Sequence, residues 1–178
     1  MATNGPTVLR HLLLVAWLLA ASIASASELA GRIVGVVDGD TVDLLTDDKQ
    51  VVRIRLAGID APERKQPFGS VAKKALSALV FAKRASLRGS KQDRYGRLIA
   101  KVLVDGRDAN LTMVSLGYAW HYKRHESEQD ARDRTLYSAA QESAMRERRG
   151  LWRDPKPIAP WEFRAARRAE VKSNSRLP

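Results

Sequence analysis

The sequence predicts an α+β, mainly β fold: a five-stranded Greek-key barrel with about three packed helices. Three observations support this prediction. Three short strands separated by polar turns come first, a helical segment follows, and two further strand segments come after that helix. A group of three strands and a group of two, interrupted by a helix, fit a five-stranded Greek-key barrel.

The first three strands are expected to form an up-down-up meander. Residues 32–37 and 41–45 are predicted to be strands, and the Asp-Gly-Asp sequence at 38–40 between them is a strong hairpin signal. A second polar turn at 47–49 leads into a third strand, which ends before Pro62. Short turns favour pairing between consecutive strands, so the meander should be antiparallel.

The third strand separates apolar from charged residues. Val52, Ile54 and Leu56 fall on one face of a period-2 strand, and Arg53 and Arg55 fall on the other. The strand therefore carries arginine side chains on the face that does not enter the core.

The remaining elements are predicted by periodicity and capping signals. Ser70 is a candidate N-cap for a helix ending near Arg84. Strands are expected at 85–92 and 98–104. Asn110 is a candidate N-cap for a short helix ending at Gly117, and a third helix is expected from Ser127 to Arg149, with Gly150 just past its end.

Four charged residues from separate segments are expected to meet at one end of the meander. If the second turn is centred on Asp48, Thr41 lies opposite Arg55, and Asp40 lies beside the end of the third strand. The predicted cluster consists of Asp40, Arg55, Asp60 and Glu63. Each has an ordinary structural explanation alone, but their convergence favours a functional site.

The chemistry of this cluster points to phosphate. Converging carboxylates in a chain without cysteine favour a hard, oxygen-ligated cation such as Ca²⁺. Glu63 is the candidate base for a water nucleophile, and Arg55 could stabilise a phosphoryl group by paired charge-assisted hydrogen bonds. Arg97, in the turn between the last two strands, could supply a second guanidinium. An EF-hand is excluded, because Lys49 would occupy its last ligand position.

The chain resembles a known family through three motifs in order. They are Asp-Gly-Asp-Thr at 38–41, an arginine before Asp-Ala-Pro-Glu at 60–63, and Tyr-Gly-Arg at 95–97. Over about residues 31–152 the sequence resembles the staphylococcal nuclease-like thermonucleases. The resemblance implies an OB-fold barrel and hydrolysis of DNA and RNA that leaves 3′-phosphates.

The resemblance also implies roles for individual residues. Asp40 and Asp60 would be Ca²⁺ ligands together with the main-chain carbonyl of Ala61, and Glu63 would assist the attacking water. Arg55 and Arg97 would bind the phosphate, and Tyr95 would contact the substrate; Arg94, in the same turn, is a further candidate contact. Ala61 departs from the threonine often found there, which is tolerable because the implied ligand is a carbonyl.

The predicted barrel is also compatible with a second function. Barrels of this type can bind single strands through basic grooves and aromatic stacking without cutting them. A noncatalytic nucleic-acid-binding module would not need Asp40, Asp60 and Glu63, which repel phosphate unless a cation intervenes. Their joint presence favours the enzyme, with single-stranded or unpaired DNA and RNA as the expected substrates.

The two ends of the chain suggest export and an appendage. Residues 1–26 have a basic residue, an apolar run and an Ala-Ser-Ala site, as in a cleaved signal peptide, so a periplasmic or secreted protein is expected. The net charge of +11 favours polyanionic partners. The nuclease-like domain is assigned to 27–152. The proline-rich and basic extension at 153–178 is expected to lie extended and then fray, either adding phosphate affinity or acting as a solubilising tail.

Overall fold

The computed structural model describes residues 29–175. Its strands are β1 (Leu29–Val36), β2 (Thr41–Thr46), β3 (Val51–Leu56), β4 (Ile59–Asp60), β5 (Arg84–Gln92), β6 (Leu98–Val104), β7 (Arg107–Asp108) and β8 (Trp120–His121). Its helices are α2 (Gly69–Val80), α3 (Ala109–Ser115), α4 (Ala131–Arg146) and α5 (Pro160–Asn174), with short 3-10 helices η1 (Lys123–Glu128) and η2 (Gly150–Arg153). The predicted signal peptide lies outside the described residues.

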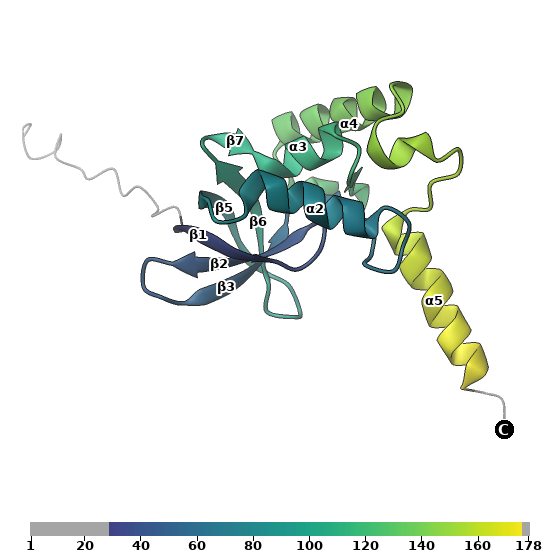
Figure 1. Ribbon diagram of the computed structural model, residues 1–178, viewed down its shortest axis with the longest axis horizontal. Coiled ribbons are helices and arrows are strands. Elements are labelled where there is room, and N and C mark those ends of the chain that lie inside the picture. Colours follow the sequence, from purple (N-terminus) through teal and green to yellow (C-terminus); the bar gives the residue numbers. More distant parts are fainter. Residues whose placement is uncertain (1–28, 176–178) are drawn as a thin grey trace, which may run out of the picture.

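Five strands close into the predicted barrel (Figure 1). β1, β2 and β3 pair antiparallel in sequence order, and β5 pairs with the other edge of β1. β6 then pairs antiparallel with β5 and parallel with β3, which joins the two ends of the sheet. The predicted register is confirmed, because Thr41 lies opposite Arg55.

Alternation along the strands fills the barrel interior. Ile33, Val42, Leu44 and Ile54 from the meander are fully buried, as is Val102 from β6. Their neighbours in sequence point away from this core, so one face of each strand is apolar and the other can carry charge. Burying such side chains stabilises the fold by about 1.5–3 kcal/mol each.

Helices α2, α3 and α4 lie on one side of the barrel (Figure 1). α2 buries Ala72, Leu76 and Val80, which recur every four residues on one helix face. α3 lies between α2 and α4, and Met113 and Val114 of α3 belong to the same core as the barrel. α2 ends at Val80 rather than near Arg84, because the following segment pairs with β1 as part of β5.

Two predicted helix caps are wrong. Ser70 lies inside α2, whose N-cap is Phe68 in a left-handed conformation with φ of 67° and no side-chain cap bond. Asp108 caps α3, since its side chain accepts a hydrogen bond from the backbone N–H of Leu111. Asn110 is instead buried, where its amide bonds the backbone of Ala57 and of β6. At Asn110, long-range hydrogen bonds took precedence over local capping.

The C-terminal segment is also different from the expectation. The predicted third helix is divided into η1 and α4, with Asp130 as the cap of α4. Beyond η2 the expectation of an extended, fraying segment is wrong for residues 160–174, which form helix α5. Proline cannot continue a helix, but its fixed φ suits the first turn, and Pro160 occupies that position. No helix among residues 29–175 is long and apolar enough to cross a membrane.

Candidate active site

The turn between β1 and β2 places a carboxylate inside the protein. Asp40 is 6% exposed and accepts hydrogen bonds from the Ala61 N–H at 2.8 Å and from the Thr41 hydroxyl at 3.1 Å. Gly39 permits this close approach, since a Cβ there would lie within 2.8 Å of the side chains of both Ala61 and Ala72. The turn is therefore clamped between the end of β4 and helix α2.

Arg55 connects this turn to the end of the third strand. Its Nη2 lies 3.2 Å from the Asp40 carboxylate and 3.0 Å from the Asp60 carboxylate. Its Nη1 donates to the carbonyls of Leu56 and Ile59 at 2.8 Å each. The guanidinium is thus fixed between two carboxylates that come from different segments. Asp40, Arg55 and Asp60 meet as the sequence predicted.

Arg53, on the same face of β3 as Arg55, makes a different contact. Its guanidinium pairs with Asp43 across the β2–β3 ladder, with a closest approach of 2.8 Å, and its side chain is 55% exposed. Pairs of this kind contribute little to stability. Arg53 is therefore a surface residue rather than a member of the cluster.

Helix α5 adds a residue to the site that sequence reasoning missed. Arg164 donates from Nη2 to Asp60 Oδ2 at 2.7 Å and from Nη1 to Glu63 Oε1 at 2.7 Å, with a further bond to Asp60 Oδ1 at 3.2 Å. It bridges the candidate metal ligand and the candidate base. The proline at the start of a run of helix-forming residues could have signalled α5, but nothing in the sequence pattern points its arginine towards a position about one hundred residues earlier.

The loop that carries Glu63 is held in place from both sides. Gln66, which is 7% exposed, accepts from the Glu63 N–H at 3.1 Å and donates to the Ile158 carbonyl at 2.6 Å. Gly69 packs so closely on this loop that a Cβ would lie 1.9 Å from the Glu63 carbonyl oxygen. The loop, the start of α2 and the segment before α5 therefore form one connected unit.

Burial sets the electrostatics of the acidic residues. It raises the pKa of Asp60, against the lowering effects of the Arg164 hydrogen bond and the Arg55 charge. It also raises the pKa of Asp38 to about 6, and the nearby Asp40 carboxylate adds to this rise. Removal from water disfavours the charged form of a carboxyl group, so these sites favour a compensating cation.

The Tyr-Gly-Arg turn forms a second cluster beside the barrel. Arg97 pairs with Asp93 at 2.7 Å, and Arg94 donates to the hydroxyl of Tyr95, whose ring lies beneath both guanidinium groups. Among the described residues, Arg97 makes no ion pair with the carboxylates of the first cluster. Because Leu98 at the start of β6 lies beside β3, strand spacing places the Arg97 backbone on the order of 8 Å from that of Arg55.

The donor atoms fit a hard cation only in part. Asp40, Asp60 and Glu63 offer carboxylate oxygens, and the Arg164 guanidinium is a positive group already drawn between two of them. No group of three or more His, Cys, Asp or Glu side chains within residues 29–175 is arranged to hold a metal ion. A cation here would depend on two carboxylates, with water and a carbonyl such as that of Ala61 completing its coordination.

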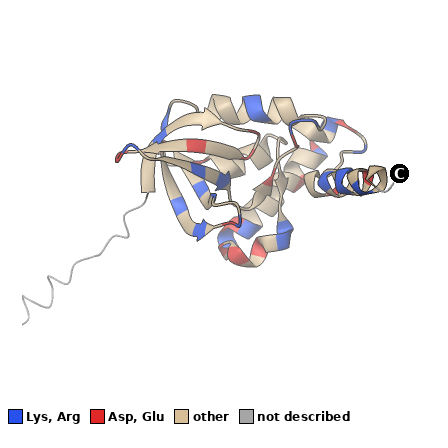
Figure 2. Cartoon of the chain, turned by 90° about the horizontal axis from the view of Figure 1, so that it is seen from below, with Lys and Arg blue, Asp and Glu red and all other residues tan. Residues whose placement is uncertain are grey.

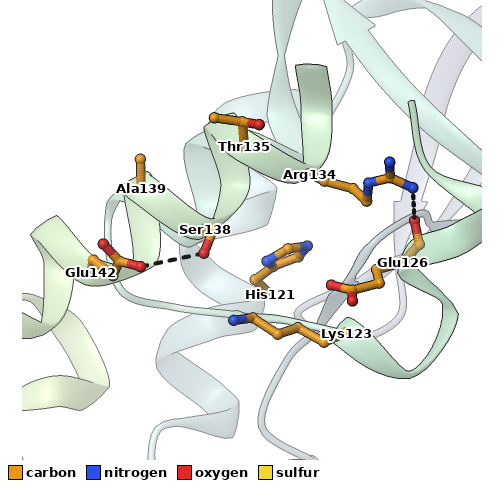
Figure 3. A pocket seen from close by; sticks show the side chains of 8 residues that line it. All are labelled: His121, Lys123, Glu126, Arg134, Thr135, Ser138, Ala139 and Glu142. Carbon is orange, nitrogen blue, oxygen red and sulfur yellow. Dashed lines mark hydrogen bonds between the residues drawn. The ribbon is translucent and has the colours of Figure 1, made fainter. Parts of the chain in front are cut away.

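A surface depression lies elsewhere on the molecule. It has a volume of about 460 Å³ and is lined by residues of α4 and of the segment around η1, including His121, Lys123 and Glu142 (Figure 3). His121 is buried and its Nε2 bonds Gln129. None of the predicted site residues lines this depression, so its size does not mark the active site.

The barrel and the cluster at the ends of β2 and β3 define a class of protein: a hydrolase built on an oligonucleotide-binding barrel. Comparison with known proteins agrees with this class. Residues 53–154 match the family described as Staphylococcal nuclease homologue. The chain therefore belongs to the staphylococcal nuclease family, and the protein is a nuclease.

Several bacterial proteins are similar over most of their length. The chain is 40% identical to Protein ParB of Escherichia coli, covering 92% of this chain and 94% of that protein. It is 39% identical to an uncharacterized endonuclease of Haemophilus influenzae, with 90% and 86% covered. It is 38% identical to the micrococcal nuclease of Shigella flexneri, with 83% and 87% covered.

Proposed function

We propose that the protein is a Ca²⁺-dependent nuclease that hydrolyses phosphodiester bonds of DNA and RNA, cutting within strands and from their ends. The observation that carries this proposal is the meeting of Asp40, Arg55, Asp60 and Glu63 at one end of the barrel. A noncatalytic binding module would gain nothing from three carboxylates beside its phosphate site. Membership of a nuclease family supports the same choice.

In this proposal, Asp40, Asp60 and the carbonyl of Ala61 hold the cation. Bound there, Ca²⁺ supplies neutralisation of phosphate charge and coordination positions that water can share. The carboxylates are suited to this task because both are buried beside Arg55, which keeps their oxygens turned towards each other. The oxygen-only chemistry of the donor set favours Ca²⁺ over zinc or copper.

The remaining residues act on water and on the phosphoryl group. Glu63 takes a proton from a water molecule while the oxygen of that water attacks phosphorus. The P–O5′ bond breaks, and the leaving O5′ receives a proton from solvent. Cleavage of this bond leaves a 3′-phosphate. Arg55 and Arg97 stabilise the negative charge on the phosphoryl oxygens by charge-assisted hydrogen bonds. Tyr95, 68% exposed between two arginines, offers a stacking face, and Arg94 an additional phosphate contact.

We also propose a preference for single-stranded or unpaired substrate and a location outside the cytoplasm. Unpaired bases can stack on the exposed ring of Tyr95, whereas bases inside a duplex are covered. Residues 1–26 support export to the periplasm or medium as a cleaved signal peptide. Mass spectrometry of the protein recovered from its host should then give a mature chain that begins at Ser27.

Digestion of end-labelled single-stranded DNA and RNA tests the proposed function. The wild-type chain should cleave both in Ca²⁺ and neither in excess chelator, and analysis of the ends should give 3′-phosphates. Asp40→Asn should lose most activity, while Asp48→Asn, in the exposed turn between β2 and β3, should retain it. Cleavage that persists in chelator would refute the Ca²⁺ requirement, and binding without cleavage would refute the enzyme.

A further inference from the structure

Arg164 engages both carboxylate oxygens of the residue on which cation binding depends. Asp60 is 1% exposed, and both of its carboxylate oxygens accept hydrogen bonds from Arg164. Its Oδ1 accepts from Arg55 as well. A carboxylate has about four lone-pair sites, so these three hydrogen bonds leave one site on Oδ2. A cation bound there would lie beside the Arg164 guanidinium, and the two positive charges would repel each other. A cation on Asp60 therefore disfavours the Arg164 contacts.

The charges of the cluster favour such an exchange. Asp40, Asp60 and Glu63 carry three negative charges, and Arg55 and Arg164 carry two positive charges. One negative charge remains on these five side chains. With Arg164 withdrawn, two remain, which a divalent cation neutralises. The guanidinium thus neutralises one of these two negative charges, whereas a divalent ion at the same place would neutralise both.

Arg164 is carried by a helix that is attached only at its beginning. Pro160 is buried, and the Trp161 ring lies 5.6 Å from that of Trp120 and 5.5 Å from that of Tyr122. From 165 to 175 every residue is exposed, and the helix projects away from the barrel (Figure 1). The Arg164 side chain is 36% exposed, at the boundary between the anchored residues and this exposed part of the helix. Segments with few buried apolar contacts open at a low cost in free energy. The contact to Asp60 and Glu63 is therefore an element that can open.

We propose that Arg164 and the catalytic cation compete for Asp60 and Glu63, so that the first turn of α5 is a latch that cation binding releases. This inference rests on the cation role proposed above. In the latched state the guanidinium occupies Glu63 Oε1, so this oxygen is not free to bond the attacking water. The nuclease is held inactive until the cation arrives, and release frees both Glu63 and the guanidinium.

Calorimetric titration with Ca²⁺ tests the competition without relying on activity. Arg164→Gln should bind Ca²⁺ about tenfold more tightly than the wild-type chain, a change of about 1.4 kcal/mol. Arg164→Lys, which keeps the charge but loses the fork of donors, should fall between the two. Arg167→Gln removes the same charge one turn later on the exposed part of α5, and it should bind like the wild type.

Tryptophan emission provides the second measurement. The Trp161 ring packs near Trp120, which in turn packs on Trp152 at 4.3 Å, so movement of the first turn of α5 should change their emission. Ca²⁺ should change the emission of the wild-type chain and of Arg167→Gln, but much less that of Arg164→Gln, whose latch is already open.

The outcomes separate this inference from the proposed function. Equal or weaker Ca²⁺ binding by Arg164→Gln would overturn the competition and make Arg164 a fixed positioning residue. Absence of Ca²⁺ binding in every variant would overturn the cation role and the latch together. If Arg164→Gln unfolds, Arg164→Lys decides the matter by the same comparison, because a latch predicts tighter binding and a fixed positioning residue predicts weaker binding.

Discussion

At the scale of single residues, the two buried aspartates depend on their arginine partners. Asp40 and Asp60 both form ion pairs with the Arg55 guanidinium, and Asp60 also pairs with Arg164. A buried charge without a partner costs several kcal/mol, so arginine and carboxylates must be kept together. The same arrangement leaves the carboxylates close enough to share a ligand. The Arg55 contacts thus serve both stability and the proposed chemistry, whereas the Arg164 contacts are those that a bound cation replaces.

The Asp93 carboxylate makes a testable contribution at this scale. Burial acts to raise its pKa, but hydrogen bonds from Arg97 outweigh burial and lower the pKa below its ordinary value of 3.8. The carboxylate therefore stabilises the fold above that value, and this contribution is lost as the pH falls through the lowered pKa. Asp93→Asn should reduce the free energy of unfolding by about 1 kcal/mol at pH 7.

Urea unfolding between pH 7 and pH 3 measures this effect. The difference between wild type and Asp93→Asn should shrink towards zero as the pH falls below 3.8. Asp105→Asn, in the exposed turn after β6, serves as a control that should show no such pattern. A difference that is constant over the whole range would show that ionisation of Asp93 is not its cause.

At the scale of elements, the start of α2 holds the loop of the candidate base. Gly69→Ala would put a methyl group against the Glu63 carbonyl, so we expect a loss of about 1–3 kcal/mol in the free energy of unfolding and reduced cleavage. Ser70→Ala is a matched control, because Ser70 is exposed and α2 has no side-chain cap bond; it should change stability by less than about 0.5 kcal/mol. Thermal melts of both variants decide the matter, and equal melting temperatures would contradict the account.

The elements also show what local sequence can predict. The meander register followed from turn position and alternation, because each strand contacts its neighbour in sequence. The capping roles of Ser70 and Asn110 were wrong, because Phe68 adopts a left-handed conformation and Asn110 bonds β6 and Ala57. Arg164 was missed for the reason that applies to Asn110. Its partners are fixed by packing between distant segments, which no local pattern records.

At the scale of the whole molecule, positive charge extends from the site along α5 (Figure 2). At about 100° per residue, Arg167, Arg168 and Lys172 lie within about 80° of Arg164, while Glu162 and Glu170 fall on the opposite side. A nuclease acting on a polyanion gains affinity from such a surface, since each phosphate contact releases counterions. The basic extension is therefore expected to add phosphate affinity rather than only solubility.

Replacing Arg167, Arg168 and Lys172 by glutamine should weaken binding of single-stranded DNA and lower the slope of log affinity against log salt by up to about 2. A control with Arg132, Arg146 and Arg148 replaced removes the same charge from exposed positions on and after α4. Fluorescence anisotropy at several salt concentrations compares the two. Equal slopes for the two triple variants would show that net charge, and not the position of these residues on α5, determines the salt dependence of binding.

The most direct test of the central claim is single-turnover cleavage of single-stranded DNA by Glu63→Gln at saturating substrate and Ca²⁺. The substitution keeps the size of the side chain and removes its ability to accept a proton, with Glu170→Gln on α5 as the control. If Glu63 is the base at this site, the rate should fall by about 10²–10⁴ while the control stays at the wild-type rate. A Glu63→Gln rate within about threefold of wild type would contradict the assignment of this cluster as the catalytic site.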